Sequence, residues 1–302
     1  MHFSTTPVRV DPTRFGGSDP GSPAATVRRV VAEAAAADGA DPLDEAALLA
    51  LRHGLGSSAL WLAGEAGFAW RHENALDLVV APAERGQGLG LALAEVAVEE
   101  PGPLTAWSHG NHPAAAALAG RLSFDRVRDL WVMRRSLADL PAATTGHAGD
   151  GDPVDVRPFR VGEDEEAFLA LNAAAFAHHP EQGGLTREGL DERMAEPWFD
   201  PAGFLVAEQG GELVGFHWTK VQEATGSQPA VGEVYVVGVS PTAQGGGLGR
   251  RLTLAGLHHL AGRGLSDVLL YVEADNAPAV AVYGRLGFSH ASEDTHVQYA
   301  RR

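Results

Sequence analysis

The stretch Val234–Arg251 joins an apolar run to a glycine-rich loop, and it constrains the fold more than any other part of the chain. Its β-branched residues predict a strand that ends at Ser240-Pro241, and the segment from Arg250 has the pattern of an amphipathic helix. Between them, Gln244–Gly249 carries four glycines in six residues. A strand, a glycine turn and a helix in this order present backbone N–H groups and the positive end of a helix dipole, which suits a phosphate group.

Two other glycine motifs do not fit this loop. A dinucleotide-binding fingerprint needs G-x-G-x-x-G, but its last position falls on Arg250 or Leu252. A Walker loop needs a lysine after its last glycine, and the only lysine of the chain, Lys220, precedes the loop. The remaining pattern is Gln-x-x-Gly-x-Gly after a strand, with an ordinary glycine-rich turn as the alternative.

A second pattern lies downstream of the loop. Asp267–Val272 predicts a buried strand, after which Asn276 can cap a helix that tolerates Pro278 in its first turn. The helix carries Tyr283 and ends at Gly287-Phe288. Together, Q-x-x-G-x-G and N-x-x-A-x-x-x-Y-x-x-x-G-F resemble the two signature halves of the GNAT N-acetyltransferases. The resemblance implies a mixed sheet with helices on both faces, an α/β fold, and acetyl-CoA as cosubstrate.

Length and composition limit the number of domains, the location of the protein and the type of nucleophile. A chain of 302 residues is at the limit for a single core, so two domains are expected. No apolar run approaches the roughly 20 residues of a membrane span, and the N-terminus lacks the pattern of a signal peptide, so we expect a cytoplasmic protein. The absence of cysteine rules out a thiol nucleophile, which favours direct transfer from donor to acceptor.

The charge of the chain bears on its partners. A net charge of −16 argues against nucleic acid, because phosphate backbones need a basic face. We expect a monomer with a small-molecule amine substrate and no membrane partner. We also expect no metal site: His258-His259 does not match a zinc motif and is interpreted as structural, and His109 and His112 lack a third ligand nearby.

The chain is an internal duplication. Arg85–Gly90 (RGQGLG) follows Leu76–Val80, a predicted strand, and an offset of 159 pairs it with the loop at Gln244. An offset of 164 pairs Gly120-Arg121-Leu122 with Gly284-Arg285-Leu286. The elements predicted in the first copy are helices at 24–37, 43–53, 89–99 and 113–122 and strands at 59–63, 67–71, 76–80 and 104–107. Those predicted in the second copy are strands at 154–159, 204–208, 212–221, 234–239 and 267–272 and helices at 163–176, 186–195, from 250 and from 276, with a loop at 178–184.

A linker separates the two copies. Residues 141–153 (PAATTGHAGDGDP) are rich in Gly, Ala, Thr and Pro, a composition typical of a linker. We therefore expect two tandem GNAT domains, an N-terminal non-catalytic domain at 1–140 and a C-terminal catalytic domain at 154–302.

The catalytic assignment depends on what the first copy lacks. Glu233 pairs with Asn74 at the offset of 159, and Tyr283 pairs with Ala119 at the offset of 164. We expect Glu233, at the start of its strand, to act as general base directly or through a water, although a surface glutamate is the alternative from the residue alone. Tyr283 would protonate the departing thiolate, the alternative being a core aromatic.

Gly238, in the middle of a predicted strand, suggests a bulge or a close backbone approach. An N–H group there could meet the thioester carbonyl as an oxyanion donor. Val237 and Val239 could offer backbone groups to the amides of the pantetheine arm, as if to an added strand.

Several longer strings resemble the mycothiol synthase family, tandem-GNAT enzymes that acetylate the cysteinyl amine of a cysteinyl–glucosaminyl–inositol conjugate. They are Asn172–Gly184, Trp198–Pro201, Gly215–Lys220 and Gly232–Val236, with a weaker match at Asp38–Glu45. The resemblance implies that five residues contact this acceptor: Glu45, Glu181, Lys220, Glu233 and Tyr271.

The same resemblance implies two coenzyme sites. The N-terminal site would consist of Leu78, Val79, Val80, Arg85, Gly86, Gln87, Gly88, Leu89 and Gly90. The catalytic acetyl-CoA would be held by Val237, Gly238, Val239, Gln244, Gly245, Gly246, Gly247, Leu248, Gly249, Arg250, Asn276, Ala277, Pro278, Ala279, Val280 and Ala281. Gly246 departs from the family, which tends to carry an arginine there, so the pyrophosphate contact would depend on backbone groups and Arg250.

Two other functions stay open from the sequence. One is a GNAT enzyme of the same mechanism that acts on another amine, such as an aminoglycoside or a protein N-terminus. The other is a non-catalytic regulator that binds acyl-CoA.

Overall fold

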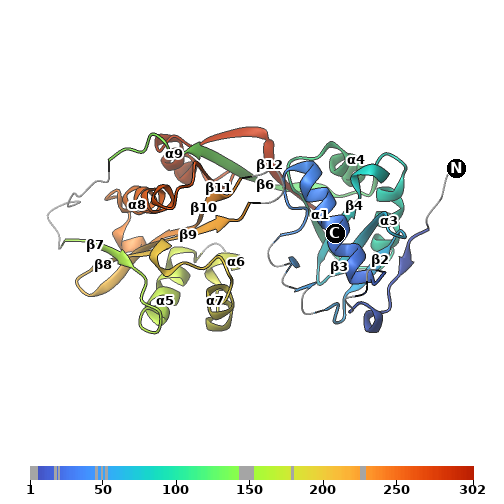
Figure 1. Cartoon of the computed structure of the whole chain (residues 1–302), viewed down its shortest axis with the longest axis horizontal. Coiled ribbons are helices and arrows are strands. Elements are labelled where there is room, and N and C mark those ends of the chain that lie inside the picture. The colour runs from blue at the N-terminus through green and yellow to red at the C-terminus, as the bar shows by residue number, and fades with distance from the viewer. Residues whose placement is uncertain are drawn as a thin grey trace. The chain divides into compact units, whose positions relative to one another are not determined.

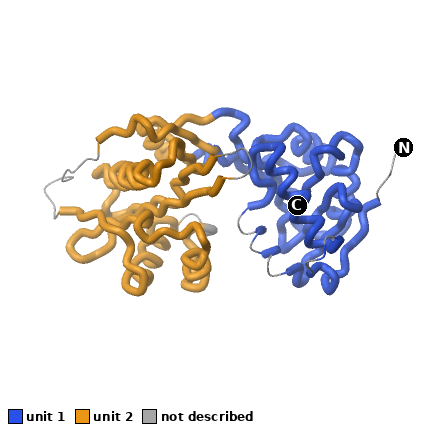
Figure 2. The backbone as a smooth tube through the Cα atoms, viewed as in Figure 1, with its two compact units in different colours: residues 1–131, 273–275, 291–302 blue, residues 132–272, 276–290 orange. Residues whose placement is uncertain are grey.

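The computed structural model describes residues 6–16, 19, 21–44, 47–48, 50–51, 54–142, 153–177, 180–224 and 229–302. The chain forms two compact units, coloured separately in Figure 2. Unit 1 comprises Met1–Trp131, Glu273–Asp275 and Ala291–Arg302, and unit 2 comprises Val132–Val272 and Asn276–His290. The predicted division at residues 141–153 stays a prediction, since residues 143–152 lie outside the described residues.

Unit 1 contains a sheet of the order β1-β2-β3-β4-β5-β12, with helices on both faces. Its strands are β1 (Val8–Arg9), β2 (Ala59–Leu62), β3 (Gly67–His72), β4 (Ala75–Val80), β5 (Leu104–Ser108) and the end of β12 (Ser289–Arg301). Its helices are α1 (Pro23–Asp38), α3 (Leu89–Val98) and α4 (Pro113–Arg121), with short 3₁₀ turns at Pro12–Arg14 and Pro82–Glu84. The predicted helix at 43–53 lies partly outside the described residues.

Alternation along the strands divides the core of unit 1 between two helices. Phe68 and Trp70 face α1, whereas Trp61 and Ala69 face α3. Side chains of successive strand residues point to opposite faces, so each face needs its own cover. Figure 1 shows α1 and α3 with this sheet between them.

Unit 2 contains a sheet of the order β7-β8-β9-β10-β11-β6. Its strands are the end of β6 (Asp125–Ser136), β7 (Asp155–Pro158), β8 (Phe204–Gln209), β9 (Glu212–Gln222), β10 (Val231–Val239) and β11 (Asp267–Glu273). Its helices are α5 (Glu165–Ala175), α6 (Pro180–Gly183), α7 (Arg187–Met194), α8 (Leu248–Gly262) and α9 (Ala277–Arg285), with 3₁₀ turns at Pro201–Gly203 and Pro241–Ala243. Within the described part of the chain, no helix is long and apolar enough to cross a membrane.

An aromatic cluster forms one half of the core of unit 2. Phe168 of α5 packs edge to face on Phe204 and Phe216, and Trp218 stacks on Phe204 with ring centroids 4.4 Å apart. The opposite face of the sheet is covered by α8, which packs through Leu248 and Leu252. Figure 1 shows α5 and α7 on one side of β8 and β9 and α8 on the other.

Some of the described strands and helices differ from the prediction, and one of them is β1, a strand of two residues that was not predicted. The strands β6 and β12 were not predicted, and each has residues in both units. Both are rich in charged and polar residues, so they lack the apolar pattern by which a strand is found in a sequence. The predicted loop at 178–184 was wrong at Pro180–Gly183, which forms the short helix α6. His178 and His179 lie outside the described residues.

The duplication is visible in the backbone. The parallel pair β4–β5 holds Ala75 opposite Thr105, and the parallel pair β10–β11 ends with Val234 opposite Leu270. Ala75 and Val234 are equivalent at the offset of 159. In both copies, therefore, the two strands of the parallel pair separate after the same position.

Candidate active site

Glu233 lies inside a central strand of unit 2 and is 5% exposed. It is the third residue of β10, so the prediction that it starts the strand was wrong: β10 begins at Val231. Its register partners are Lys220 on β9 and Leu269 on β11. The side-chain amide of Gln222 donates to Glu233 Oε2 at 2.8 Å. The carboxylate is therefore buried and held in one orientation by a neutral donor.

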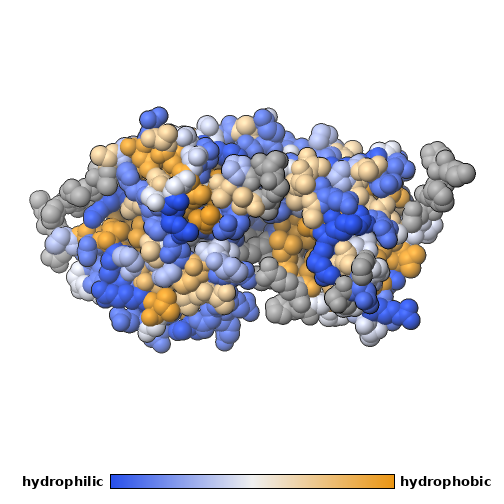
Figure 3. Space-filling model, in the orientation of Figure 1, coloured by the Kyte–Doolittle hydropathy of each residue, from blue (hydrophilic) through white to orange (hydrophobic). Residues whose placement is uncertain are grey.

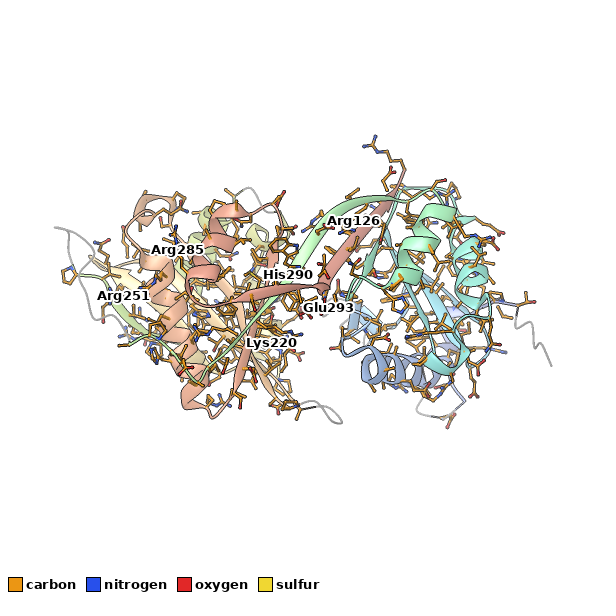
Figure 4. The ribbon with its side chains drawn as sticks, turned by 90° about the horizontal axis from the view of Figure 1, so that it is seen from above. Arg126, Lys220, Arg251, Arg285, His290 and Glu293 are labelled. Atoms are coloured by element: carbon orange, nitrogen blue, oxygen red, sulfur yellow. The ribbon has the colours of Figure 1, made fainter. Side chains whose placement is uncertain are left out.

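Lys220 on β9 places an ammonium group next to two aromatic rings. Its Nζ lies 4.6 Å from the ring centroid of Trp198 and 5.2 Å from that of Tyr235. The negative faces of the two rings attract the ammonium group. Lys220 is also directly opposite Glu233 in an antiparallel pair, and the side chains of such residues lie close together. Lys220 is thus positioned on the face of the sheet that carries Glu233. Figure 4 shows Lys220 well apart from Arg251, which lies on α8.

The other predicted acceptor residues are placed in part. Tyr271 on β11 is 40% exposed, and it lies two residues after Leu269, hence on the same face as Glu233. The backbone of Glu181 belongs to α6, whose position is described without this side chain. Glu45 lies outside the described residues. The structure therefore brings Lys220, Glu233 and Tyr271 to one face.

The sheet opens next to Glu233. Among the described residues, β10 and β11 pair only from Gly232 to Val234 on β10, whereas β10 pairs with β9 as far as Val239. The register shifts between Val234 and Val236, so the bulge suggested for Gly238 lies upstream of that residue. Gly238 instead shows the close approach that was the alternative, because a Cβ atom there would lie 2.4 Å from the ring of Phe216. On the side of β11, the end of β10 keeps an open edge.

The glycine loop lies where β10 ends. Gly245 and Gly247 have φ angles of 87° and 78°, a region that L side chains rarely adopt, and Gly247 is the N-cap of α8. The side chain of Gln244 donates to Val239 O at 3.3 Å and fixes the start of the loop. The first N–H groups of a helix have no partner within it, and Arg250 is exposed in the first turn. The loop has the chemistry of an anion site.

Helix α9 confirms the predicted cap and carries the predicted phenol. Asn276 accepts from Ala279 N at 3.2 Å, and Pro278 lies in the first turn. Ala277, Pro278 and Ala281 of this helix are exposed. Figure 3 shows hydrophobic colour in the region of α9. Burial raises the pKa of Tyr283 to about 12, so its phenol keeps the proton at neutral pH.

The N-terminal loop repeats this geometry with different side chains. Gly86 and Gly88 have φ angles of 77° and 86°, and Gly88 is the N-cap of α3. Arg85 Nε donates to Val80 O at 3.1 Å, as Gln244 does to Val239 O. The two Nη atoms of Arg85 donate to Asp38 at 2.6 and 2.7 Å, so this guanidinium is engaged by a carboxylate.

The remaining residues predicted for that site lie on β4, in the loop and at the start of α3, and Val79 packs on the opposite face of the sheet from Leu78 and Val80. Gln87 Nε2 lies 3.1 Å from Glu84 Oε2, and a Cβ atom at Gly90 would meet Leu118, Val80 and Leu78 at 3.6 to 3.9 Å. Leu78 and Val79 belong to β4, and Leu89 begins α3.

Comparisons with known proteins show the family to which the chain belongs. Residues 171–288 match the model of the Acetyltransferase (GNAT) family. A mycothiol acetyltransferase of Nocardioides sp. is 56% identical over 292 residues, which cover 92% of this chain and 97% of the relative. A mycothiol acetyltransferase of Streptomyces bingchenggensis is 52% identical and covers 89% of this chain and 90% of its own.

This chain belongs to the mycothiol acetyltransferase family. It is a GNAT acetyltransferase.

Solved structures show the same architecture. The GCN5-related N-acetyltransferase of Sphaerobacter thermophilus superposes with a TM-score of 0.64 at 25% identity and covers 92% of this chain and 93% of its own. A tandem GNAT protein from the clavulanic acid biosynthesis pathway has a TM-score of 0.59 at 21% identity, with 81% and 82% covered. The second likeness concerns the fold alone. The mixed α/β fold with tandem GNAT architecture, predicted from the sequence, is confirmed.

The histidines that the sequence analysis set aside have ordinary partners. His258 Nε2 lies 2.9 Å from Pro141 O, and His259 Nε2 lies 3.2 Å from Asp200 Oδ2. His109 Nδ1 lies 3.0 Å from His296 Nδ1, a pair that the sequence did not indicate because β12 was not predicted. In the part of the chain that the structure describes, no three potential metal ligands come together.

Trp218 was not among the predicted site residues. This residue is 1% exposed, lies two positions before Lys220 on β9, and pairs with Val236 of β10. It contributes to a cleft of about 40 Å³ on the α5 side of the sheet. The cleft is lined by Phe168, Gln182, Leu185, Arg193, Trp218, Tyr235 and Val236. A tryptophan at i−2 from the only lysine is a signal that strand periodicity could have supplied.

Proposed function

We propose that the chain transfers an acetyl group from acetyl-CoA to the cysteinyl amine of 1D-myo-inositol 2-(L-cysteinylamino)-2-deoxy-glucopyranoside and so forms mycothiol. The names of its relatives support the product. The observation that carries the proposal is the buried Glu233 beside the point where β10 and β11 separate. A carboxylate at this point would meet an amine from one side and a thioester from the other.

The described residues fit acetyl-CoA, which supplies an activated acetyl group as a thioester. The loop Gln244–Arg250 would bind the pyrophosphate through backbone N–H groups at the start of α8. The open edge at Val237–Val239 would accept the amides of the pantetheine arm, as a strand does. Asn276–Ala281 would cover the cofactor with the exposed apolar start of α9.

Glu233 would act as the general base. An α-amino group has an unperturbed pKa near 8, so only about a tenth of the acceptor is neutral at pH 7. The carboxylate, directly or through a water, takes a proton from the ammonium group, and the neutral amine attacks the thioester carbonyl. Such a base contributes roughly 10² to 10⁴ in rate. Lys220 and Tyr271, which share its face, would bind the acceptor together with Glu181 and Glu45.

Tyr283 would act as the general acid. Collapse of the tetrahedral intermediate expels a thiolate, which needs a proton. Burial raises the pKa of Tyr283 to about 12, so the phenol carries its proton at neutral pH but is a weaker acid than a free tyrosine. The N–H of Gly238 or of a neighbouring residue on the open edge would stabilise the oxyanion.

Unit 1 would bind a second coenzyme without catalysing a reaction. Its pocket would be formed by Leu78–Val80 and Arg85–Gly90, but Asn74 and Ala119 stand where unit 2 has Glu233 and Tyr283. Because Arg85 is engaged by Asp38, the pyrophosphate would depend on backbone N–H groups there. The proposal also includes the domain bounds 1–140 and 154–302. It includes a monomeric protein with a cytoplasmic location, and no nucleic-acid, membrane or metal partner.

The test is an assay of thiol release. The protein is mixed with acetyl-CoA and the cysteinyl–glucosaminyl–inositol amine, and free coenzyme A is followed with time. We expect release that depends on the amine, with an acetylated product of the expected mass. Release with an aminoglycoside or a peptide amine but not with this acceptor would overturn the substrate, and no release with any amine would overturn the catalytic function.

A further inference from the structure

The cleft between α5, α6, α7 and the sheet contains a buried donor with no acceptor. The indole Nε1 of Trp218 has no hydrogen-bond partner among the described residues, although the side chain is 1% exposed. Buried N–H groups in proteins are paired in the great majority of cases, because an unpaired one costs free energy. Trp70, the other fully buried tryptophan, shows the ordinary situation, since its indole donates to Ser58 Oγ at 2.8 Å.

The walls around the Trp218 indole favour an oxygen atom as its partner. Arg193 brings a positive charge, and its Nε donates to the hydroxyl of Tyr235 at 3.1 Å. Arg193 Nη1 donates to Gly189 O at 2.8 Å, which fixes the guanidinium on α7. Phe168, Leu185 and Val236 supply apolar walls. A ligand group that enters this cleft must offer lone pairs and fit between apolar side chains.

The size and position of the cleft restrict the group further. A volume of about 40 Å³ holds a few atoms but not a six-membered ring. The cleft is formed by Tyr235 and Val236, two and three residues after Glu233, which corresponds to roughly 7–10 Å along the strand. Tyr235 also contacts Lys220 through its ring, so the cleft adjoins the residues to which the acceptor is assigned.

We propose that this cleft is a subsite for the exocyclic hydroxymethyl group of the glucosamine ring, whose oxygen accepts a hydrogen bond from the indole N–H of Trp218. The proposal rests on the proposed function. The ring hydroxyls are attached directly to the sugar ring, so they would reach the indole only if the ring itself entered. The hydroxymethyl group projects one carbon beyond the ring and matches the volume. Trp218 is thereby a residue that selects the sugar and takes no part in the proton transfers.

The first test changes the ligand and leaves the protein intact. The wild-type enzyme is assayed with the cysteinyl–glucosaminyl–inositol amine and with its 6-deoxy-glucosaminyl analogue, which lacks this one oxygen. We expect kcat/KM to fall about 3- to 10-fold for the analogue, the effect of one neutral hydrogen bond, with the KM for acetyl-CoA unchanged. Equal kcat/KM values would overturn the subsite and leave the proposed function standing, whereas inactivity with the parent amine would overturn the proposed function.

The second test removes the donor. Trp218→Phe lacks the indole N–H and keeps an aromatic ring on Phe204, so we expect it to react equally with the parent and the 6-deoxy amine. Trp70→Phe in unit 1 is the matched control, because its N–H is already bonded within the protein, and it should discriminate as the wild type does. A folded Trp218→Phe enzyme that still prefers the parent amine 3-fold or more would overturn the assignment. If this variant does not fold, Val236→Leu, which fills the cleft from β10, should abolish the same preference.

Discussion

Glu233 and His217 are two buried ionisable residues of one sheet, and their surroundings give them different roles. Glu233 accepts a hydrogen bond from Gln222 at 2.8 Å and lies where β10 and β11 separate, the place proposed for the proton transfer. His217 is fully buried between β9 and α8, where its Nδ1–H donates to Leu252 O at 2.9 Å. Its Nε2 has no partner among the described residues. The first residue belongs to the proposed reaction, and the second to the stability of the fold.

Replacement of Glu233 by glutamine removes the base and retains the shape of the side chain. We expect Glu233→Gln to lower kcat and kcat/KM about 10²- to 10⁴-fold, while the affinity for acetyl-CoA stays within a factor of about 2. Steady-state kinetics and calorimetric titration with coenzyme A measure the two effects. Glu212→Gln, at the exposed start of β9, is the control and should be fully active. A fully active Glu233→Gln enzyme would remove this residue from the mechanism.

His217 predicts a loss of stability in acid. Burial lowers the pKa of His217 to about 4, although the hydrogen bond to the Leu252 carbonyl opposes this shift, while the unfolded chain titrates near 6.5. Between these values the unfolded state binds the extra proton, so stability falls as the pH drops from 6.5 toward 4, by about 3 kcal/mol in total. Urea unfolding at pH 7.5 and 4.5 should show a smaller difference for His217→Gln. Identical differences for the two proteins would contradict the assignment.

At the scale of elements, the sequence predicts those that carry either a hydrophobic period or a glycine signal. The strands β8 to β11 and helices α5, α7, α8 and α9 were predicted within a few residues. Apolar residues recur along most of these elements, whereas α7 buries only Leu190. The strands β6 and β12 were missed, since charged residues interrupt them and their place is set by neighbouring strands. The register shift near Tyr235 and the unpaired indole of Trp218 are products of tertiary packing. No local pattern could have shown them.

The contact between β9 and α8 makes one helix position intolerant of any side chain. A Cβ atom at Gly256 would lie 2.1 Å from the ring of His217, whereas nothing lies within 4 Å of one at Gly262, at the end of the same helix. We expect Gly256→Ala to lower the free energy of unfolding by roughly 1–3 kcal/mol because the buried ring cannot move aside. Gly262→Ala should change it by less than about 1 kcal/mol. Thermal unfolding of both variants measures the contrast, and equal effects would show that the helix adjusts freely.

At the scale of the whole molecule, both copies of the duplication keep the geometry of the glycine loop, but only the second copy has the two side chains proposed to react. Both copies keep two glycines with positive φ, a helix capped by the second of them, and a side-chain bond back to the last strand residue. The first copy has no carboxylate or phenol at the positions of Glu233 and Tyr283. A chain that keeps the loop without the reactive groups is expected to bind in both units and to react in one.

A matched pair of variants tests this division. Gly88 and Gly247 cap equivalent helices with φ angles of 86° and 78°, and nothing lies within 4 Å of a Cβ atom at either. Aspartate adopts a positive φ more readily than most L side chains, and both substitutions carry the same kind of backbone strain, so the strain does not distinguish the two variants. Each substitution places a negative charge where a pyrophosphate would bind. Two like charges at close range cost several kcal/mol, so we expect Gly247→Asp to lower kcat/KM for acetyl-CoA roughly 100-fold or more. Gly88→Asp should retain turnover and bind one coenzyme fewer per chain. Loss of turnover in Gly88→Asp, with an unchanged Tm, would mean that the first copy takes part in the reaction despite lacking the two reactive side chains.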